Sequence, residues 1–421
     1  MIAEKTMGRV EEQAGEAGKW PTLLILSLAE LLAMGVWFSA SAVVPALTRE
    51  WTLDGSGQAW LTMSVQIGFV AGAFGSALLN LGDRVPTRWL FSGSALLAAL
   101  MTALIPVSAS GLPAALPLRF LTGVFLAGVY PIGMKIMATW TKADRGLGIG
   151  LLVGALTVGS ALPQLLKIFG GLDDWPRVLY LAAALATLGA GLAAWFVREG
   201  PFRSPAPRFN WRFIGEIAKD RGMALANLGY LGHMWELYAM WSWIPIFLAA
   251  SFALDPAMKA RGDSAVWASG ASFAVIAVGG IGSLIAGRLA DRIGRTVITI
   301  VSMAVSGACA LTVGLLFGGS PILLVALCLV WGFAVVADSA QFSACISELA
   351  DPLYIGTALT IQTSIGFLLT LVTIRGLPVV AGLVGWQWAF ALLAVGPAVG
   401  VWAMGALRGS AGAVKLAGGR R

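Results

Sequence analysis

The sequence predicts an all-α membrane protein in which twelve transmembrane helices form two pseudo-symmetric six-helix bundles. Of the 421 residues, 58% are hydrophobic and 12% are charged. Soluble globular domains carry about 25% charged residues, so this composition excludes an ordinary soluble domain. Two charged, glycine-containing loops of the same kind, around Asp83 and Asp291, lie 208 residues apart, which is about half the chain. This spacing indicates a duplicated half.

A helix needs about 20 apolar residues to cross a bilayer, and the sequence offers twelve such runs. They are residues 20–47, 58–80, 88–108, 113–139, 147–169, 177–197, 223–253, 265–286, 296–318, 321–346, 354–378 and 386–407. The connections are short except at 198–221, where prolines and basic residues indicate a linker. We therefore predict an N-tail at 1–19, a first bundle at 20–197, a linker at 198–221, a second bundle at 222–408 and a C-tail at 409–421.

The distribution of basic residues predicts the orientation. If both tails are cytoplasmic, the tails, the linker and the loops near Asp83, Asp144 and Asp291 carry 20 of the 28 Lys and Arg residues, and the opposite loops carry five. Cytoplasmic loops of membrane proteins are enriched in Lys and Arg in this way. The net charge of +7 is spread over loops and forms no basic stripe, so it indicates topology and not nucleic-acid binding.

Further pairs of similar segments support the duplication. Glu30–Trp37 opens the first span and Glu236–Trp243 opens the seventh, and they share Glu, Leu, Ala, Met and Trp at an offset of 206. Trp60 and Trp267 begin the second and eighth spans at an offset of 207. Such regular offsets predict two halves related by an axis along the membrane normal.

The loop Gly287–Arg295 closely resembles the G-x-L-A-D-R-x-G-R signature of the major facilitator superfamily, found between its second and third and its eighth and ninth helices. The first copy retains only the Gly, Asp and Arg at 82–84. The resemblance implies the fold of this superfamily, with spans 1, 4, 7 and 10 around a central cavity. In the family the loop Asp pairs with basic groups and helps to close the cytoplasmic side. This implies gating roles for Asp83, Arg84, Asp291, Arg292 and Arg295.

Ionisable groups inside spans are costly unless they are paired or face water, so each is a functional candidate. Glu30 lies about 15 Å into the first span at 1.5 Å per residue, and Glu236 is its counterpart in the seventh. We interpret the two acids as facing one shared watery cavity and relaying protons. Pairing with basic groups and cation binding are the alternatives. His233, one turn before Glu236, and Asp338 in the tenth span complete the predicted proton-coupling set.

The predicted substrate-binding set combines basic, aromatic and amide side chains. Arg119–Gly128 resembles the span-four signature of the superfamily, although Thr122 stands where Gln is frequent, and this implies proton coupling or anion binding for Arg119. For Arg119 the alternative is a structural bond to a carboxylate or a carbonyl group. For Lys135 the alternative is snorkelling, and for the aromatic and amide groups it is helix packing. The set comprises Arg119, Lys135, Arg375, Tyr130, Tyr238, Trp241, Gln341 and Gln362.

These features favour a proton-coupled secondary active transporter that moves a small polar or anionic solute across the bacterial inner (plasma) membrane by alternating access. The alternative is proton-driven efflux of cationic drugs or metal ions, although no clustered ligands support a tight metal site. A membrane enzyme or sensor is disfavoured because no nucleotide loop or catalytic Ser-His-Asp set occurs. We expect no cofactor, no nucleic-acid partner and a monomer in the bilayer, with the solute and protons as ligands.

Overall fold

The computed structural model describes residues 2–141, 145–202, 209–351 and 353–420, and these are almost entirely helical, without a β-strand. The loop at Asp144 and the middle of the predicted linker, 203–208, lie outside the described residues. The first half contains α1 (Ile2–Met34), α2 (Ser39–Ala42), α3 (Val44–Trp51), α4 (Gly55–Leu79), α5 (Leu81–Arg84), α6 (Thr87–Ser108), α7 (Leu112–Leu126), α8 (Tyr130–Ala138), α9 (Arg145–Gly170) and α10 (Trp175–Phe196).

The second half and its connecting segments follow the same all-helical plan. They contain η1 (Trp211–Phe213), α11 (Ile214–Lys219), α12 (Arg221–Phe252), α13 (Pro256–Arg261), α14 (Ser264–Ile293), α15 (Arg295–Thr312), η2 (Val313–Leu316), α16 (Pro321–Ala337), α17 (Ser339–Leu349), α18 (Ile355–Val384), α19 (Trp386–Ala389), η3 (Phe390–Ala394), α20 (Val395–Arg408) and η4 (Ala411–Gly419).

Ten helical segments of the described chain are long and apolar enough to cross a membrane. They correspond to ten of the twelve predicted runs. The other two runs, 20–47 and 223–253, fall in α1 and α12, which are 33 and 32 residues long and pack among the ten. In α12, the polar side chains of His233 and Glu236 lower the hydropathy of an otherwise apolar helix. The twelve predicted segments are thus all helical, and ten of them qualify as spans by length and composition.

Local signals in the sequence explain where several helices begin and end. Asp54, Asp174 and Asp220 precede α4, α10 and α12, and each carboxylate accepts a hydrogen bond from a backbone N–H in the first turn. Such caps satisfy donors that have no partner within the helix. Gly294 and Gly385 end α14 and α18 with φ values of 102° and 78°, which glycine adopts without steric cost.

Three predicted spans are interrupted. In the run 20–47, α1 ends at Met34 and the chain continues as the short helices α2 and α3. The run 113–139 breaks at 127–129, between α7 and α8, and the run 321–346 breaks at Asp338, between α16 and α17. Pro131 lies in the first turn of α8, where its missing N–H has no helical acceptor to lose. Helix breaks free carbonyl groups, and these need partners within the bundle.

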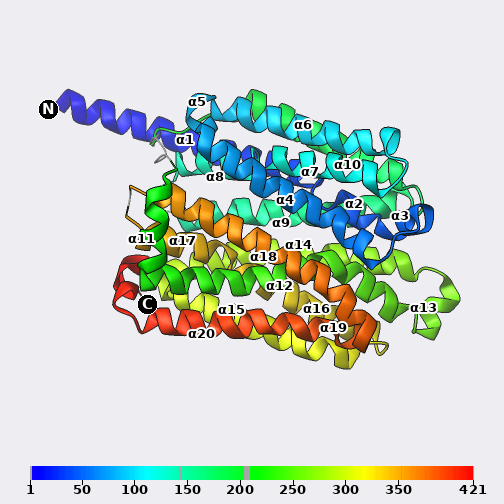
Figure 1. Ribbon diagram of the computed structural model, residues 1–421. Coiled ribbons are helices and arrows are strands. Elements are labelled where there is room, and N and C mark those ends of the chain that lie inside the picture. Colours follow the sequence, from blue (N-terminus) through cyan, green and yellow to red (C-terminus); the bar gives the residue numbers. More distant parts are fainter. Residues whose placement is uncertain (1, 142–144, 203–208, 352, 421) are drawn as a thin grey trace.

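The two halves repeat the same helix pairings. In the first half α4 packs on α7, α6 on α10 and α1 on α10; in the second half α14 packs on α16, α15 on α20 and α12 on α20. Figure 1 shows the first half (blue through cyan to the green of α10) above the second (green through yellow to red), with both chain termini at one end. We call this end the terminal end.

Close packing within each half depends on glycine. A Cβ atom added to Gly123 of α7 would lie 1.9 Å from the carbonyl oxygen of Val65 in α4. The corresponding contact in the second half is between α16 and α14, where a Cβ atom on Gly332 would lie 1.8 Å from the carbonyl oxygen of Val275. No larger residue fits at either position without separating the helices, which explains part of the high glycine content.

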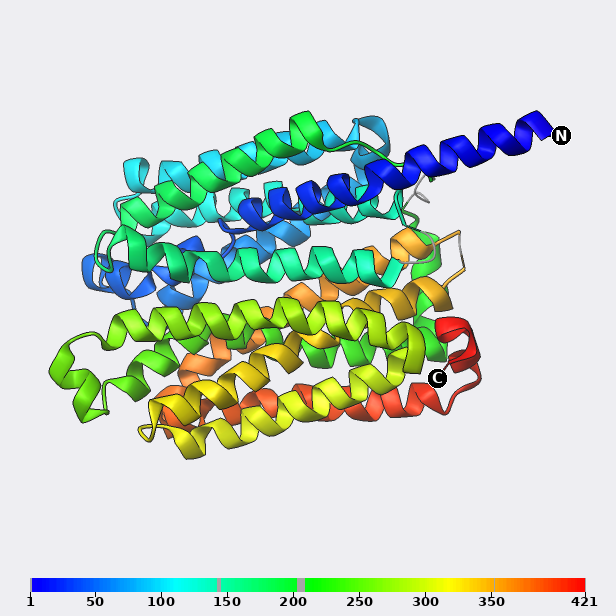
Figure 2. The ribbon, with the colours of Figure 1, turned by 180° about the vertical axis from the view of Figure 1, so that it is seen from behind.

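The halves meet along two seams of different construction. In the glycine seam, α9 runs beside α14, as Figure 2 shows from behind, and a Cβ atom on Gly154 would lie 3.2 Å from the carbonyl oxygen of Gly280. In the aromatic seam, α4 runs beside α18, and the rings of Phe69 and Phe367 lie 4.8 Å apart. The glycine seam is therefore a contact of backbones, and the aromatic seam is a contact of side chains.

Candidate functional site

A central pocket of about 90 Å³ lies between the halves, walled by both broken and continuous helices. Rings and hydroxyl groups dominate its wall, and the predicted residues Tyr130, His233, Tyr238 and Trp241 all contribute. The remaining lining residues are Trp37, Phe69, Met134, Ile149, Val153, Leu156, Thr157, Tyr230, Met234, Leu237, Val336, Ser339, Ala340, Ser343, Thr363 and Phe367.

The aromatic side chains of the pocket form one contiguous cluster. Ring centroids lie 5.0 Å apart for Trp37 and Phe69, 5.0 Å apart for Tyr238 and Phe367, and 5.5 Å apart for Tyr238 and Trp241. The indole N–H groups of Trp37 and Trp241 are buried and have no hydrogen-bond partner among the described residues. Buried donors are normally satisfied, so two donors at the wall of a pocket are available to a bound solute.

His233, which lines the pocket, forms a buried pair with Asp338. The Nδ1 atom of His233 lies 2.8 Å from Oδ1 of Asp338, and each residue is only 2% exposed. These two atoms are close enough for an ion pair, but their relative orientation does not meet the criteria for a hydrogen bond. On its other side, Nε2 of His233 lies 2.8 Å from the hydroxyl of Ser339, which also lines the pocket. The break between α16 and α17 places Asp338 and Ser339 in this arrangement.

Glu236 does not line the central pocket, contrary to the prediction. Its two carboxylate oxygens accept hydrogen bonds of 2.7 Å from the hydroxyl of Ser306 and from the indole N–H of Trp331. Both donors belong to the second half, on α15 and α16. The side chain therefore points from α12 into the core of its own bundle, and His233 one turn earlier is paired with Asp338 instead of Glu236.

Glu30 occupies the corresponding place in the first half, and it is also absent from the pocket wall. Its side chain is fully buried, and neither carboxylate oxygen has a partner among the described residues. A Cβ atom on Gly133 of α8 would lie 2.7 Å from Oε2 of Glu30, and the ring of Phe91 on α6 borders the same spot. The predicted shared cavity for the two acids is thus wrong, although their equivalence between the halves is retained.

Arg119 is a structural anchor in this conformation and not a pocket residue. Its guanidinium donates hydrogen bonds to the carbonyl oxygens of Leu61, Val36 and Trp37, at 3.2 Å and 2.9 Å for the first two. Val36 and Trp37 lie in the break after α1, where carbonyl groups have lost their helical partners. Of the alternatives that the sequence left open, bonding to carbonyl groups is the one observed, and anion binding at the pocket is not.

The other predicted binding residues outside the pocket have different environments. Gln341 accepts a 2.9 Å hydrogen bond from Arg295, and Gln362 is 2% exposed with its amide oxygen and nitrogen unpartnered. Arg375 is half-buried on α18, with no ion-pair partner in the described part of the chain. These three residues do not line the central pocket. Helix position alone did not indicate the direction of their side chains.

Lys135 belongs to the loop around Asp83. Its ammonium group contacts the Asp83 carboxylate and donates a 2.6 Å hydrogen bond to the carbonyl oxygen of Gly82. It also lines a second cavity of about 230 Å³ between α4, α8 and α18, which Phe209 of the linker borders. Asp83 thus contacts a basic residue that lies 52 positions later in the chain, which the sequence did not indicate.

The corresponding loop in the second half contains a denser network. Arg295 makes two hydrogen bonds to Glu348, of 2.9 Å and 2.6 Å, and lies 3.4 Å from Asp291. Arg292 is exposed and forms no ion pair within the described ranges. Sequence reasoning therefore identified Asp291 and Arg295 as partners and missed Glu348, which lies 53 residues after Arg295. We call Asp291, Arg295, Gln341 and Glu348 the loop network.

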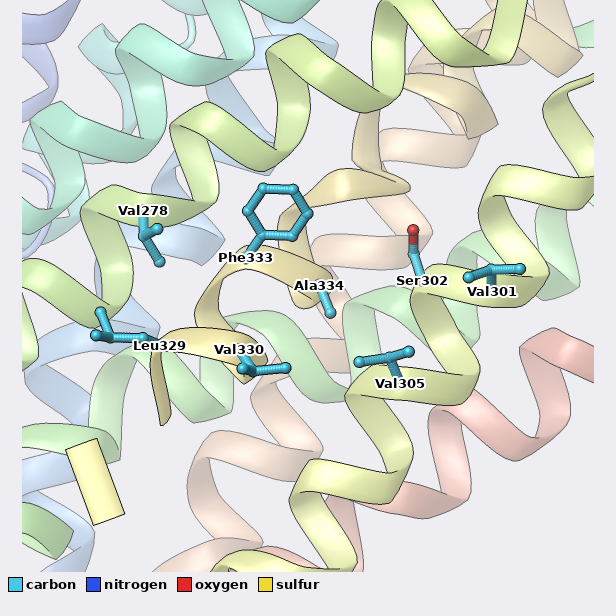
Figure 3. Close-up of a pocket in the computed structure, with 8 residues that line it drawn as sticks. All are labelled: Val278, Val301, Ser302, Val305, Leu329, Val330, Phe333 and Ala334. Atoms are coloured by element: carbon cyan, nitrogen blue, oxygen red, sulfur yellow. The ribbon is translucent and has the colours of Figure 1, made fainter. Parts of the chain in front are cut away.

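A further groove, of about 410 Å³, opens on the outer surface of the second half (Figure 3). Seven of its eight lining residues are apolar, and the hydroxyl of Ser302 is the exception. Val301 and Val330 are 56% and 51% exposed there. Its chemistry suits hydrocarbon and not a polar solute, so it does not compete with the central pocket as a transport site.

Comparison with known proteins agrees with this architecture. The sequence profile of the Major Facilitator Superfamily matches residues 26–374. The chain belongs to this superfamily of transporters. Its fold is therefore the all-α fold of the superfamily, and it is a multi-pass transmembrane transporter.

Two curated relatives are described as uncharacterized transporters. The chain is 30% identical over 178 residues to the putative uncharacterized transporter YgaY of Escherichia coli strain K12 and to YgaY of Escherichia coli O157:H7. Each alignment covers 42% of this chain and 44% of the relative, so the chain matches less than half of the length of these relatives.

Solved structures show the same fold at low sequence identity. The crystal structure of the nucleoside transporter NupG superposes with a TM-score of 0.67 at 17% identity, covering 92% of this chain and 98% of NupG. A bacterial homologue of the human lysosomal transporter Spinster, in an inward-facing and occupied conformation, gives 0.66 at 15% identity, covering 91% and 96%. At these identities the likeness concerns the fold alone.

Proposed function

We propose that this protein is a proton-coupled secondary active transporter in which the His233–Asp338 pair binds and releases the proton. The observation that carries the proposal is that the pair is buried and that one of its members, His233, lines the central pocket. Histidine changes charge between about pH 5 and 8, and the carboxylate of Asp338 lies 2.8 Å from the ring of His233. A solute bound in the pocket would therefore lie beside His233, a side chain whose charge changes when it binds or releases a proton.

The lining of the pocket supports a small amphipathic solute, neutral or weakly cationic, in place of an anion. Arg119, Lys135 and Arg375, which were expected to attract an anion, are all outside the pocket wall. Aromatic faces attract cations and stack on flat apolar groups, and the indole N–H groups of Trp37 and Trp241 would bind a carbonyl or similar acceptor. The efflux of an organic cation, the alternative from the sequence, is consistent with this wall. A metal cargo is not supported, since no group of three or more His, Cys, Asp or Glu gathers within the described chain.

Glu30 is the second proposed proton site. A fully buried carboxyl group without a hydrogen-bond partner is much more stable neutral than charged. Glu236 differs because Ser306 and Trp331 both donate hydrogen bonds to it, and these bonds fix its side chain in the core of the second half. We assign Glu30 to proton uptake when the first half opens to water, and Glu236 to holding α12 against α15 and α16.

The remaining expectations stand as proposals. The Lys and Arg distribution and the location of both termini at one end support a bacterial inner membrane protein with both tails cytoplasmic. The contact pattern supports halves at 20–197 and 222–408, with the linker at 198–221 between them. We propose that these halves rock about the central pocket and that the protein works as a monomer. The loops around Asp83 and Asp291 would open and close the terminal end in each cycle.

Proteoliposomes that contain a trapped pH-sensitive dye would test the proposed function. Panels of neutral, cationic and anionic organic solutes are added outside, and solute-driven pH change inside is recorded. We expect a neutral or cationic solute to move protons, and His233→Gln to abolish that proton movement. Transport that proceeds equally well without a proton flux, or a response to anions alone, would refute the coupling or the solute class respectively.

A further inference from the structure

The last described residues of the chain fold back onto the terminal end of the second half. In η4 the side chains of Ala413 and Leu416 are fully buried, although the segment lies beyond the last span. The segment contacts α17 most extensively, and also α12, α14 and α20. Figure 1 shows it in red beside α11 and α17, where C marks the chain end. We call residues 411–420 the C-terminal segment.

Two polar contacts join the C-terminal segment to the loop network. The backbone N–H of Ala417 donates a 2.9 Å hydrogen bond to Oε2 of Glu348. The guanidinium of Arg420 donates a 2.6 Å hydrogen bond to the backbone carbonyl of Asp291. Glu348 Oε2 is also the acceptor for Nε of Arg295, at 2.9 Å. The segment therefore helps to position both acids that surround Arg295.

The loop network in turn reaches the other half of the protein. A Cβ atom added to Gly146, in the first turn of α9, would lie 2.4 Å from Oδ2 of Asp291. One added to Gly287 would lie 2.9 Å from the backbone carbonyl of Gly146. The Asp291 carboxylate thus lies against the N-terminal turn of α9, where partial positive charge favours an anion. This contact closes the glycine seam at the terminal end.

We propose that the C-terminal segment is a clamp that holds this end of the glycine seam closed. By bonding the Asp291 backbone and Glu348, it keeps the loop network in the arrangement that meets α9. Displacement of the segment, by truncation or by a partner that binds it, then shifts the protein toward opening at the terminal end. The inference rests on the proposed gating role of Asp291, and it does not depend on the solute or on protons.

Cysteine accessibility tests the clamp without any transported solute. Ser283 of α14 is fully buried in the glycine seam, with its hydroxyl 3.4 Å from the carbonyl of Gly150. The reporter is Ser283→Cys in a protein whose three native cysteines, all buried, are replaced by alanine. Its reaction rate with a water-soluble maleimide is measured in proteoliposomes. The rate is compared between the full chain and variants of the segment.

We expect a chain that stops after Gly409 to be labelled about ten times faster than the full chain. Arg420→Ala or Leu416→Ala should raise the labelling rate about three- to fivefold, because each removes one or two of the contacts that hold the segment. Lys415→Ala, an exposed change in the same segment, is the matched control and leaves the rate unchanged. If the truncated chain fails to fold, the two point variants decide the outcome. Unchanged labelling in both, with an intact gel-filtration profile, overturns the clamp. Because no gradient is used, this failure is distinct from a failure of proton coupling.

Discussion

The contact between His233 and Asp338 predicts a measurable energetic coupling. At 2.8 Å and an effective dielectric constant of about 20, two opposite charges attract by about 6 kcal/mol. Desolvation of each buried group offsets several kcal/mol of this attraction. A net coupling of about 1–3 kcal/mol remains, in the range measured for residues of one buried ionic network.

A double-mutant cycle of His233→Gln and Asp338→Asn measures this coupling. Both substitutions keep the approximate shape and polarity of the side chain and remove the charge. Each single variant and the double variant are unfolded reversibly in mixed micelles at a pH where histidine is protonated. We expect the double variant to be more stable than the sum of the single losses implies, by about 1–3 kcal/mol. The same variants should lose solute-driven proton movement in proteoliposomes.

A coupling below about 0.5 kcal/mol, which is the range of additive, independent sites, would refute the pairing. Normal proton movement in both single variants would refute its functional role even if the coupling were found. A variant of the exposed Lys415 serves as the control for nonspecific effects of removing a charge.

Three other predictions address the anchor, the packing and the pocket. Arg119→Ala removes three buried hydrogen bonds to carbonyl groups and should lower the free energy of unfolding by about 3 kcal/mol. A loss under about 1 kcal/mol in denaturation would contradict the anchoring role. Gly123→Val should prevent the protein from folding into a monodisperse form, as measured by gel filtration. Gly93→Ala, where no atom lies within 4 Å of the added Cβ, should leave the gel-filtration profile unchanged. Trp241→Phe keeps an aromatic ring but removes an unpartnered N–H. In a thermal-shift titration it should therefore weaken binding of an active solute about five- to tenfold. Trp195→Phe, at an exposed position, is the control, and equal affinity of the two variants for the solute would exclude the Trp241 indole as a donor.

Much of the fold follows from the sequence because its signals are long and repeated. Apolar runs near 20 residues give the helices, and the loop pair at Asp83 and Asp291 gives the duplication. Helix breaks were not predicted, since Gly35, Gly128 and Asp338 lie within runs that remain apolar on average. The interruptions depend on which tertiary partners receive the freed carbonyl groups, as Arg119 does for the break after α1. Such partners are distant in sequence.

The candidate site was predicted only in part, and side-chain direction explains the difference. His233, Tyr238 and Trp241 lie on the face of α12 that lines the pocket, while Glu236 on the same helix points into its own bundle. Residues three and four apart share a face only broadly, and neighbouring helices decide which side chain meets the pocket. Lys135 was assigned to solute binding because no local feature indicates its contact with Asp83.

The unequal construction of the two seams has a consequence for how the halves can turn. Where α9 and α14 touch through backbone atoms, few side chains must change rotamer when the glycine seam parts. Where α4 and α18 touch, the rings of Phe69 and Phe367 interlock and Thr370 donates a hydrogen bond to Gln66. Opening of the aromatic seam would have to separate these side chains. In the conformational cycle that we propose, we therefore expect the activation barrier to be concentrated there, and smaller side chains at these positions to speed the cycle.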